Sequence, residues 1–144
     1  MATTATITLT SADIAGDPVN VSKTATCTKA GTTTDLDQTT GLNRVHLRSV
    51  TQKTLLTGNA EGNDLAAKVY IINKSTDASL YVTITINAQT IGKLYGGDFM
   101  FIPWSQTDTS ASIEVAATNW TSSTGDIPVE YALFHEDTDY LTNA

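Results

Sequence analysis

The stretch that decides the fold is residues 67–86, which read AKVYIINKSTDASLYVTITI. Apolar residues recur at every second position on both sides of a polar centre, first at Val69 and Ile71 and then from Leu80 to Ile86. A two-residue period is typical of a β-strand with one dry and one wet face. The polar residues 73–77 between the two runs predict a hairpin with a longer loop.

The same period extends outward from this stretch in both directions. Toward the start of the chain, Ala5, Ile7 and Leu9 alternate with threonines, which predicts a strand with a dry face. The other alternating segments are Val19 to Cys27, Arg44 to Arg48 with a short continuation to Leu56, Ile91 to Leu94, Ile113 to Ala117 and Ile127 to Leu133. Residues 99–102 form an unbroken apolar run, which predicts burial on both faces.

These segments predict an all-β fold, either an antiparallel β-sandwich or a jelly roll, with eight or nine strands. The polar run from Lys29 to Gly41 is expected to be a loop, and a single helical turn is expected near Glu61 to Ala67. With 144 residues and no break in composition, residues 1–144 are expected to form one domain around one core.

Charge and cysteine content narrow the classes of function. The net charge is −7, from 8 Lys and Arg against 15 Asp and Glu, and the cations are scattered. We therefore expect neither nucleic-acid binding nor docking on anionic membranes. Cys27 is the only cysteine, which excludes an internal disulfide, and its phase predicts a buried side chain. The start of the chain lacks a secretory pattern, so synthesis in a cytoplasm is expected.

No catalytic, metal or cofactor motif emerges, and we expect a protein that is not an enzyme. The acidic residues at 35–37 depart from a calcium loop, and those at 135–139 are interpreted as solvated. The possible bases, His46 and His135, lie in no known motif. Glu114 and Glu130 alternate with apolar residues and are expected to point to solvent.

Aromatic residues and strand edges are the remaining candidates for binding. Trp104 is expected in the core, whereas Trp120 fits a core residue or an interface anchor equally well. The Thr-rich arm, residues 1–11, is expected to pair with a neighbouring strand or subunit, because unpaired β edges invite strand addition. The candidate interface residues are Thr4, Thr6, Thr8, Tyr95 and Trp120.

Four segments carry a resemblance to small structural proteins of tailed bacteriophage virions. They are residues 67–73, the Val82-Thr83-Ile84 strand, residues 94–104 (LYGGDFMFIPW) and residues 129–134 (VEYALF). In that group a strand ending in Asn leads to a hairpin, a glycine-acid-aromatic stretch ending in Ile-Pro-Trp follows, and a closing strand comes late.

The resemblance implies a capsid decoration or cement protein on the outer surface of the virion, assembled as a homotrimer and bound to the major capsid protein. A neck, tail or fibre component is the alternative within that group. A carbohydrate-binding module that uses Trp120 and Tyr81 is a second class, and an enzyme is a third.

Overall fold

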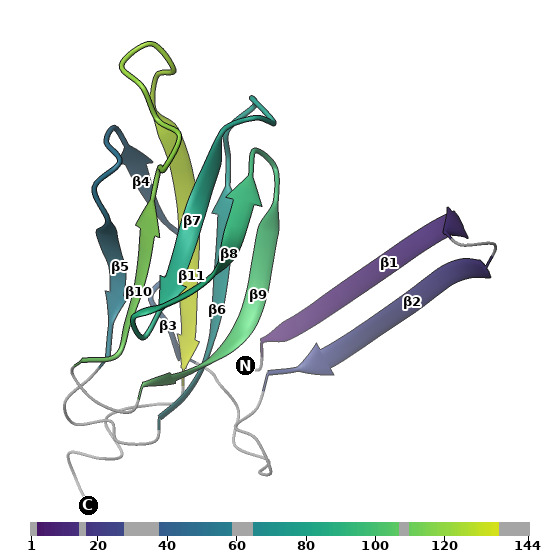
Figure 1. Ribbon diagram of the computed structural model, residues 1–144. Coiled ribbons are helices and arrows are strands. Elements are labelled where there is room, and N and C mark those ends of the chain that lie inside the picture. Colours follow the sequence, from purple (N-terminus) through teal and green to yellow (C-terminus); the bar gives the residue numbers. More distant parts are fainter. Residues whose placement is uncertain (1–2, 15–16, 28–37, 59–64, 107–109, 136–144) are drawn as a thin grey trace, which may run out of the picture.

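The computed structural model describes residues 3–14, 17–27, 38–58, 65–106 and 110–135, and these residues are all-β (Figure 1). They contain eleven strands: β1 (Thr4–Ile14), β2 (Asp17–Thr26), β3 (Gln38–Thr39), β4 (Asn43–Leu47), β5 (Lys53–Thr57), β6 (Leu65–Asn73), β7 (Tyr81–Ile86), β8 (Gln89–Tyr95), β9 (Phe99–Gln106), β10 (Ser112–Ala116) and β11 (Ile127–His135). Every described strand pairing is antiparallel.

Nine of these strands form a sandwich of two sheets (Figure 1). One sheet is four-stranded, in the order β5-β10-β7-β8, and the other is five-stranded, in the order β3-β11-β6-β9 with β4 also pairing to β11. The remaining two strands, β1 and β2, form a separate two-stranded sheet. The predicted antiparallel β-sandwich is therefore confirmed.

The core lies between the two sheets and is built from every second residue of their strands. Val69, Ile71, Val82, Ile113 and Val115 are almost fully buried, as the alternation predicted. Trp104 of β9 joins this core, also as expected, and its indole Nε1 donates to the Asn87 side chain at 3.3 Å. The hydrophobic effect of this shared interior is the main source of stability of the sandwich.

The structure has eleven strands where eight or nine were expected. One predicted strand is divided into two, and one predicted loop contains a strand. The segment from Arg44 to Leu56 was expected to be one strand with a continuation, yet β4 and β5 lie in different sheets. The two-residue strand β3 lies in the polar run that was expected to be only loop, and it pairs with the end of β11.

The predicted hairpin at residues 67–86 is wrong, because β6 and β7 belong to opposite sheets. The chain crosses between the sheets at residues 74–80 instead of turning back beside β6. The real hairpin is the next one, β7–β8, whose two-residue turn places Asn87 and Ala88 at φ values of 47° and 64°. Positive φ at both central positions is the geometry that matches the twist of a tight hairpin.

Two further expectations are also wrong. Residues 99–102 are not buried on both faces: Phe99 is 61% exposed and Phe101 36% exposed, whereas Met100 and Ile102 pack on the core. An apolar side chain on the outer face is indistinguishable by type from one on the inner face. The helical turn expected at Glu61 to Ala67 is replaced by strand β6 from Leu65 onward, and residues 61–64 lie outside the described residues.

A buried asparagine joins the two sheets where the chain crosses between them. The Asn73 side chain is 0% exposed, and its Nδ2 donates to the Leu80 and Leu94 carbonyls, at 3.0 Å each. Its Oδ1 accepts from the Ser75 backbone N–H at 2.9 Å. One side chain thus satisfies the ends of β7 and β8 and the start of the crossing segment.

The turn between β8 and β9 lies against the same crossing segment. The Gly97 N–H donates to the Asn73 carbonyl at 2.8 Å, and Gly97 has a φ of 92°. A Cβ on Gly96 would meet the Asp77 carbonyl oxygen in severe overlap and the Ser75 carbonyl oxygen at 2.8 Å. Glycine is therefore required at these two positions for different reasons. At Gly96 the backbone of residues 75–77 leaves no room for a Cβ, and at Gly97 the turn needs a positive φ.

Candidate interaction surface

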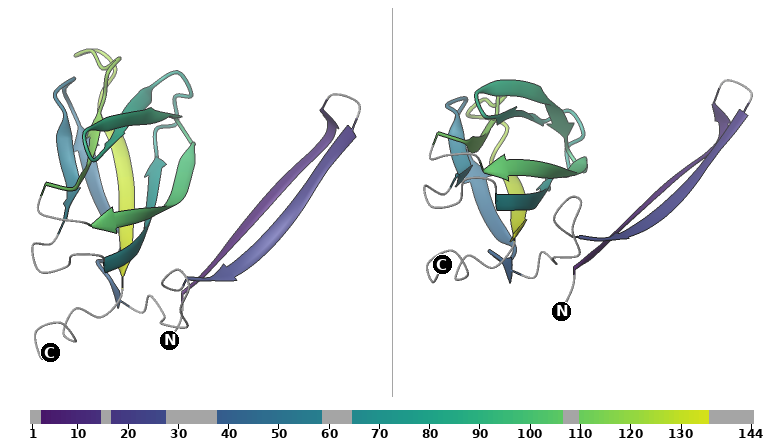
Figure 2. Two further views of the ribbon diagram at one scale, coloured as in Figure 1. Left: turned by 60° about the horizontal axis from the view of Figure 1, so that its bottom comes forward. Right: turned by 90° about the horizontal axis from the view of Figure 1, so that it is seen from below.

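The strands β1 and β2 form a long hairpin that projects from the sandwich (Figure 2). The register runs from Thr4 opposite Thr26 to Ser11 opposite Val19, with an irregularity before Ile14. Within the described residues these strands pair only with each other. Of the predicted arm at residues 1–11, residues 4–11 therefore pair with β2 of their own chain, and residues 1–2 lie outside the described residues.

One side of the hairpin is polar and carries the three candidate threonines. Thr4, Thr6 and Thr8 face the same side as Ser22 and Thr24 of the partner strand. Hydroxyl groups meet across the strands, with Thr6 Oγ1 at 2.7 Å from Thr24 Oγ1 and Thr8 Oγ1 at 3.5 Å from Ser22 Oγ. The threonines stabilise the hairpin by cross-strand pairing while keeping hydroxyls toward water.

The other side of the hairpin is apolar and exposed. We call it the apolar side, because most of its residues are aliphatic; its members are Ala5, Ile7, Leu9, Ser11, Val19, Val21, Lys23 and Ala25. Ile7 and Leu9 are 48% and 50% exposed, and Val19 and Val21 are 39% and 40% exposed. The prediction that Ile7 and Leu9 line a dry face is therefore wrong for this chain on its own. Alternation correctly identified the apolar side but could not show whether another layer covers it.

The base of the hairpin is fixed by Cys27. The Cys27 N–H donates to the Thr3 carbonyl at 2.8 Å, and the side chain is only 3% exposed, so its predicted burial is confirmed. Burial raises the pKa of the Cys27 thiol, and the Lys68 ammonium of β6 lowers it by a smaller amount. This thiol is a small buried group at the base of the hairpin.

A second exposed apolar surface lies on the outer face of the five-stranded sheet. We call it the aromatic face; its members are Tyr70 and Ile72 of β6, Phe99 and Phe101 of β9, and Phe134 of β11. The register puts Tyr70 beside Phe101 and Ile72 beside Phe99. The Phe101 and Phe134 ring centroids are 6.3 Å apart, and those of Tyr70 and Phe99 are 6.5 Å apart. This surface was not predicted, because residues 99–102 were expected to be buried on both faces.

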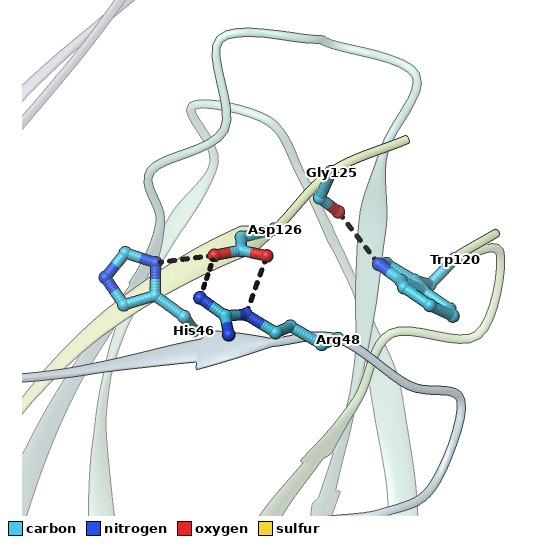
Figure 3. Close-up of polar contacts among 5 residues, drawn as sticks. All are labelled: His46, Arg48, Trp120, Gly125 and Asp126. Atoms are coloured by element: carbon cyan, nitrogen blue, oxygen red, sulfur yellow. Dashed lines mark hydrogen bonds and ion pairs between the residues drawn. The ribbon is translucent and has the colours of Figure 1, made fainter. Parts of the chain in front are cut away.

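The other two candidate interface residues lie on different parts of the sandwich. Tyr95 of β8 is 42% exposed, and its ring centroid is 5.3 Å from that of Tyr81, which Lys93 covers at 4.2 Å. Trp120 packs against the core, and its Nε1 donates to the Gly125 carbonyl at 2.8 Å (Figure 3). Of the two interpretations of Trp120, the structure shows the core contact.

A charged cluster beside Trp120 is the nearest approach to a catalytic arrangement (Figure 3). Arg48 donates two hydrogen bonds to Asp126, each of 2.8 Å, and His46 Nδ1 lies 3.7 Å from Asp126 Oδ2. The bond from Arg48 holds the pKa of Asp126 below its usual range, and His46 adds a weaker effect. The carboxylate is committed to the guanidinium, which leaves it poorly placed to orient His46 as a base.

The two glutamates considered for sugar hydrolysis do not face each other. Glu114 of β10 and Glu130 of β11 lie on the outer faces of opposite sheets. Glu130 is only 7% exposed although it lies on an outer face, so its predicted exposure to solvent is wrong. Its Oε1 accepts from Arg44 Nη2 at 2.5 Å and lies 3.8 Å from Lys74 Nζ, and the bond from Arg44 is the main cause of its lowered pKa.

We expect Arg44→Gln to make the protein less stable at neutral pH and to leave its stability in acid nearly unchanged. Because the folded state lowers the pKa of Glu130, the ionised carboxylate contributes stability above the unfolded-state pKa. That contribution disappears as the pH falls through the folded-state pKa. Urea unfolding of parent and variant from neutral pH to about pH 2 measures the difference.

Arg48→Gln is the matched control for this prediction, because the Arg48 side chain is 72% exposed and its pair with Asp126 lies in water. Surface pairs of this kind contribute little to stability. A loss in Arg44→Gln that stays the same from neutral pH into acid would show that the ion pair with Glu130 is not its cause.

Within the described ranges, no group of three or more His, Cys, Asp or Glu side chains is arranged to hold a metal ion. The acidic stretch at 35–37 and residues 136–139 lie outside the described residues. No helix in the described part of the chain has the length and hydropathy of a membrane span. No protein-family model, curated protein or solved structure matches this chain.

Proposed function

We propose that this chain is a non-enzymatic structural subunit that attaches to a protein shell through the hairpin β1–β2. The shell we propose is the outer surface of a tailed-phage capsid, where the chain acts as a decoration or cement protein bound to the major capsid protein. The observation that carries the proposal is the exposed apolar side of the hairpin.

A hairpin of this kind is poorly suited to exist alone. Two strands without a third layer are marginally stable in water. Here four large aliphatic side chains on one side are between 39% and 50% exposed, while the opposite side is hydroxyl-rich. Contiguous exposed apolar surface is typical of a binding site for another protein. An extended ribbon that is wet on one side and dry on the other suits attachment along a protein surface.

The charge of the chain supports the outside of a nucleic-acid-filled particle as its location. The net charge of −7 opposes contact with packaged nucleic acid. The resemblance of residues 67–73, 94–104 and 129–134 to virion proteins adds the particular kind of shell. A neck, tail or fibre position is the alternative within the same class, since the hairpin could dock there equally well.

The test is cosedimentation of the purified chain with empty capsid shells of the tailed phage that encodes it. We expect saturable binding at a fixed ratio of subunit to capsid protein, lost in Leu9→Asp and retained in Thr10→Asp. These neighbours lie on opposite sides of the same strand, and both are exposed. Binding to isolated tails in place of shells would move the proposal to the alternative position, and binding to neither would refute it.

One observation favours a carbohydrate-binding module as a second candidate. Tyr95, which is 42% exposed, and the partly exposed Tyr81, with Lys93 over its ring, form an aromatic pair on the outer side of β7 and β8. Sugar rings stack on platforms of this type. Glycan-array binding that is lost in Tyr95→Ala and kept in Leu9→Asp would favour this function over shell attachment.

A further inference from the structure

We infer that the aromatic face of a second copy of this chain receives the apolar side of the hairpin. This inference rests on the proposed structural role and concerns the chain away from a shell, where a second copy covers the apolar side that the shell covers after attachment. Each copy would contribute its hairpin to a neighbour and accept one in return, which closes a symmetric oligomer.

The two surfaces match in chemistry. The apolar side carries aliphatic side chains, and the aromatic face carries four rings and Ile72, so their contact removes apolar area from water on both partners. Lys23 lies within the apolar side, opposite Ile7. An ammonium in that position finds a favourable partner in the face of an aromatic ring, whereas a purely aliphatic surface would leave it without one.

The two surfaces also match in size. Ten residues per strand, at roughly 3.3 Å each on two strands about 4.8 Å apart, give the hairpin a side of about 300 Å². Contact hides a similar area on the receiving face, and a reciprocal exchange makes two contacts, so about 1,200 Å² is removed in total. That total reaches the lower end of the range for specific, stable protein interfaces.

The direction of the hairpin favours exchange between copies over folding back on the same chain. Figures 1 and 2 show β1 and β2 extending away from both sheets, with β9 and β6 left uncovered by the hairpin. Phe99 of β9 is accordingly 61% exposed. Both surfaces therefore remain exposed in one chain and are open to a second copy.

Analytical ultracentrifugation of the full chain without shells tests this inference. The parent protein is expected to form a closed oligomer of two or more copies. Leu9→Asp, on the hairpin, and Phe101→Asp, on the receiving face, are each expected to be monomers. The matched controls are Thr10→Asp on the polar side and Thr90→Asp at the exposed start of β8, and both are expected to assemble as the parent does.

Mixing the two defective variants identifies the partner surface directly. Leu9→Asp keeps an intact aromatic face and Phe101→Asp keeps an intact hairpin, so the equimolar mixture is expected to form a one-to-one complex at high concentration. This complex is weaker than the parent oligomer, because its single contact removes about 600 Å² in place of about 1,200 Å². The four substituted side chains, of Leu9, Thr10, Thr90 and Phe101, are exposed. Circular dichroism with thermal unfolding checks that each variant folds.

The inference is overturned by a parent protein that remains monomeric at high concentration, by assembly of Phe101→Asp like the parent, or by a mixture that forms no complex. Its failure is separable from failure of the proposed function. A monomer that still binds shells through Leu9 would support the proposed function and exclude the second copy as partner. An oligomer that binds neither shells nor tails would support the second copy as partner and refute the proposed function.

Discussion

The substitution Asn73→Asp is expected to lower the free energy of unfolding by about 3–5 kcal/mol, because it leaves a buried carboxylate facing two carbonyl oxygens. In the parent protein, Nδ2 donates to the Leu80 and Leu94 carbonyls, and the residue is 0% exposed. A carboxylate cannot donate to either carbonyl. Urea unfolding followed by circular dichroism measures the loss.

Asn119→Asp provides the matched control for this prediction. Asn119 also ties neighbouring segments, donating to the Ser79 carbonyl at 2.9 Å and accepting from the Tyr81 N–H at 3.2 Å, but it is partly exposed to water. The decrease in the free energy of unfolding caused by Asn119→Asp is expected to stay below about 1 kcal/mol. The effect of Asn73→Asp should also shrink in acid, where the carboxyl group is neutral and donates one hydrogen bond. Equal losses at the two sites would contradict a special role for Asn73.

The substitution Gly96→Ala is expected to lower the free energy of unfolding by about 2–3 kcal/mol through steric overlap. The added Cβ would overlap the Asp77 carbonyl oxygen and lie 2.8 Å from the Ser75 carbonyl oxygen. Both are backbone atoms of the segment that crosses between the sheets. They cannot rotate aside as a flexible side chain could, so the crossing segment itself must shift.

Gly92→Ala in β8, the strand that leads into this turn, is the control, because a Cβ there has no heavy atom within 4 Å. This substitution is expected to be neutral or slightly stabilising, since alanine restricts the unfolded chain more than glycine does. Thermal unfolding of both variants checks the difference. A tolerated Gly96→Ala would mean that the contact between residues 75–77 and the β8–β9 turn is loose.

The all-β class and much of the core were predictable from alternation, as at Ile113 and Val115, which the structure buries completely. The path of the chain between the two sheets was not predictable from alternation. A polar segment between two apolar strands fits a hairpin and a crossing equally well, and residues 74–80 follow the second course. What fixes the crossing is the three-way bonding of the Asn73 side chain, which depends on residues distant in sequence and has no local pattern.

The candidate interaction surface was predicted only in part. The threonines of β1 indicated the correct element, but they form its polar side, and the large exposed apolar residues of this strand are Ile7 and Leu9. Alternation identifies which side of a strand is apolar and carries no information on what covers it. For the same reason Phe99 and Phe101 were assigned to the interior, and Glu130, alternating like a surface residue, was not expected to be buried.

Chemical labelling shows whether protein covers the apolar side of the hairpin in the assembled state. In a Cys27→Ser background, maleimide labelling rates would be compared for Leu9→Cys and Thr10→Cys, in dilute protein and in assembled protein. We predict that assembly slows labelling at position 9 several-fold and leaves position 10 unchanged. Equal labelling of position 9 in the two states would contradict the account.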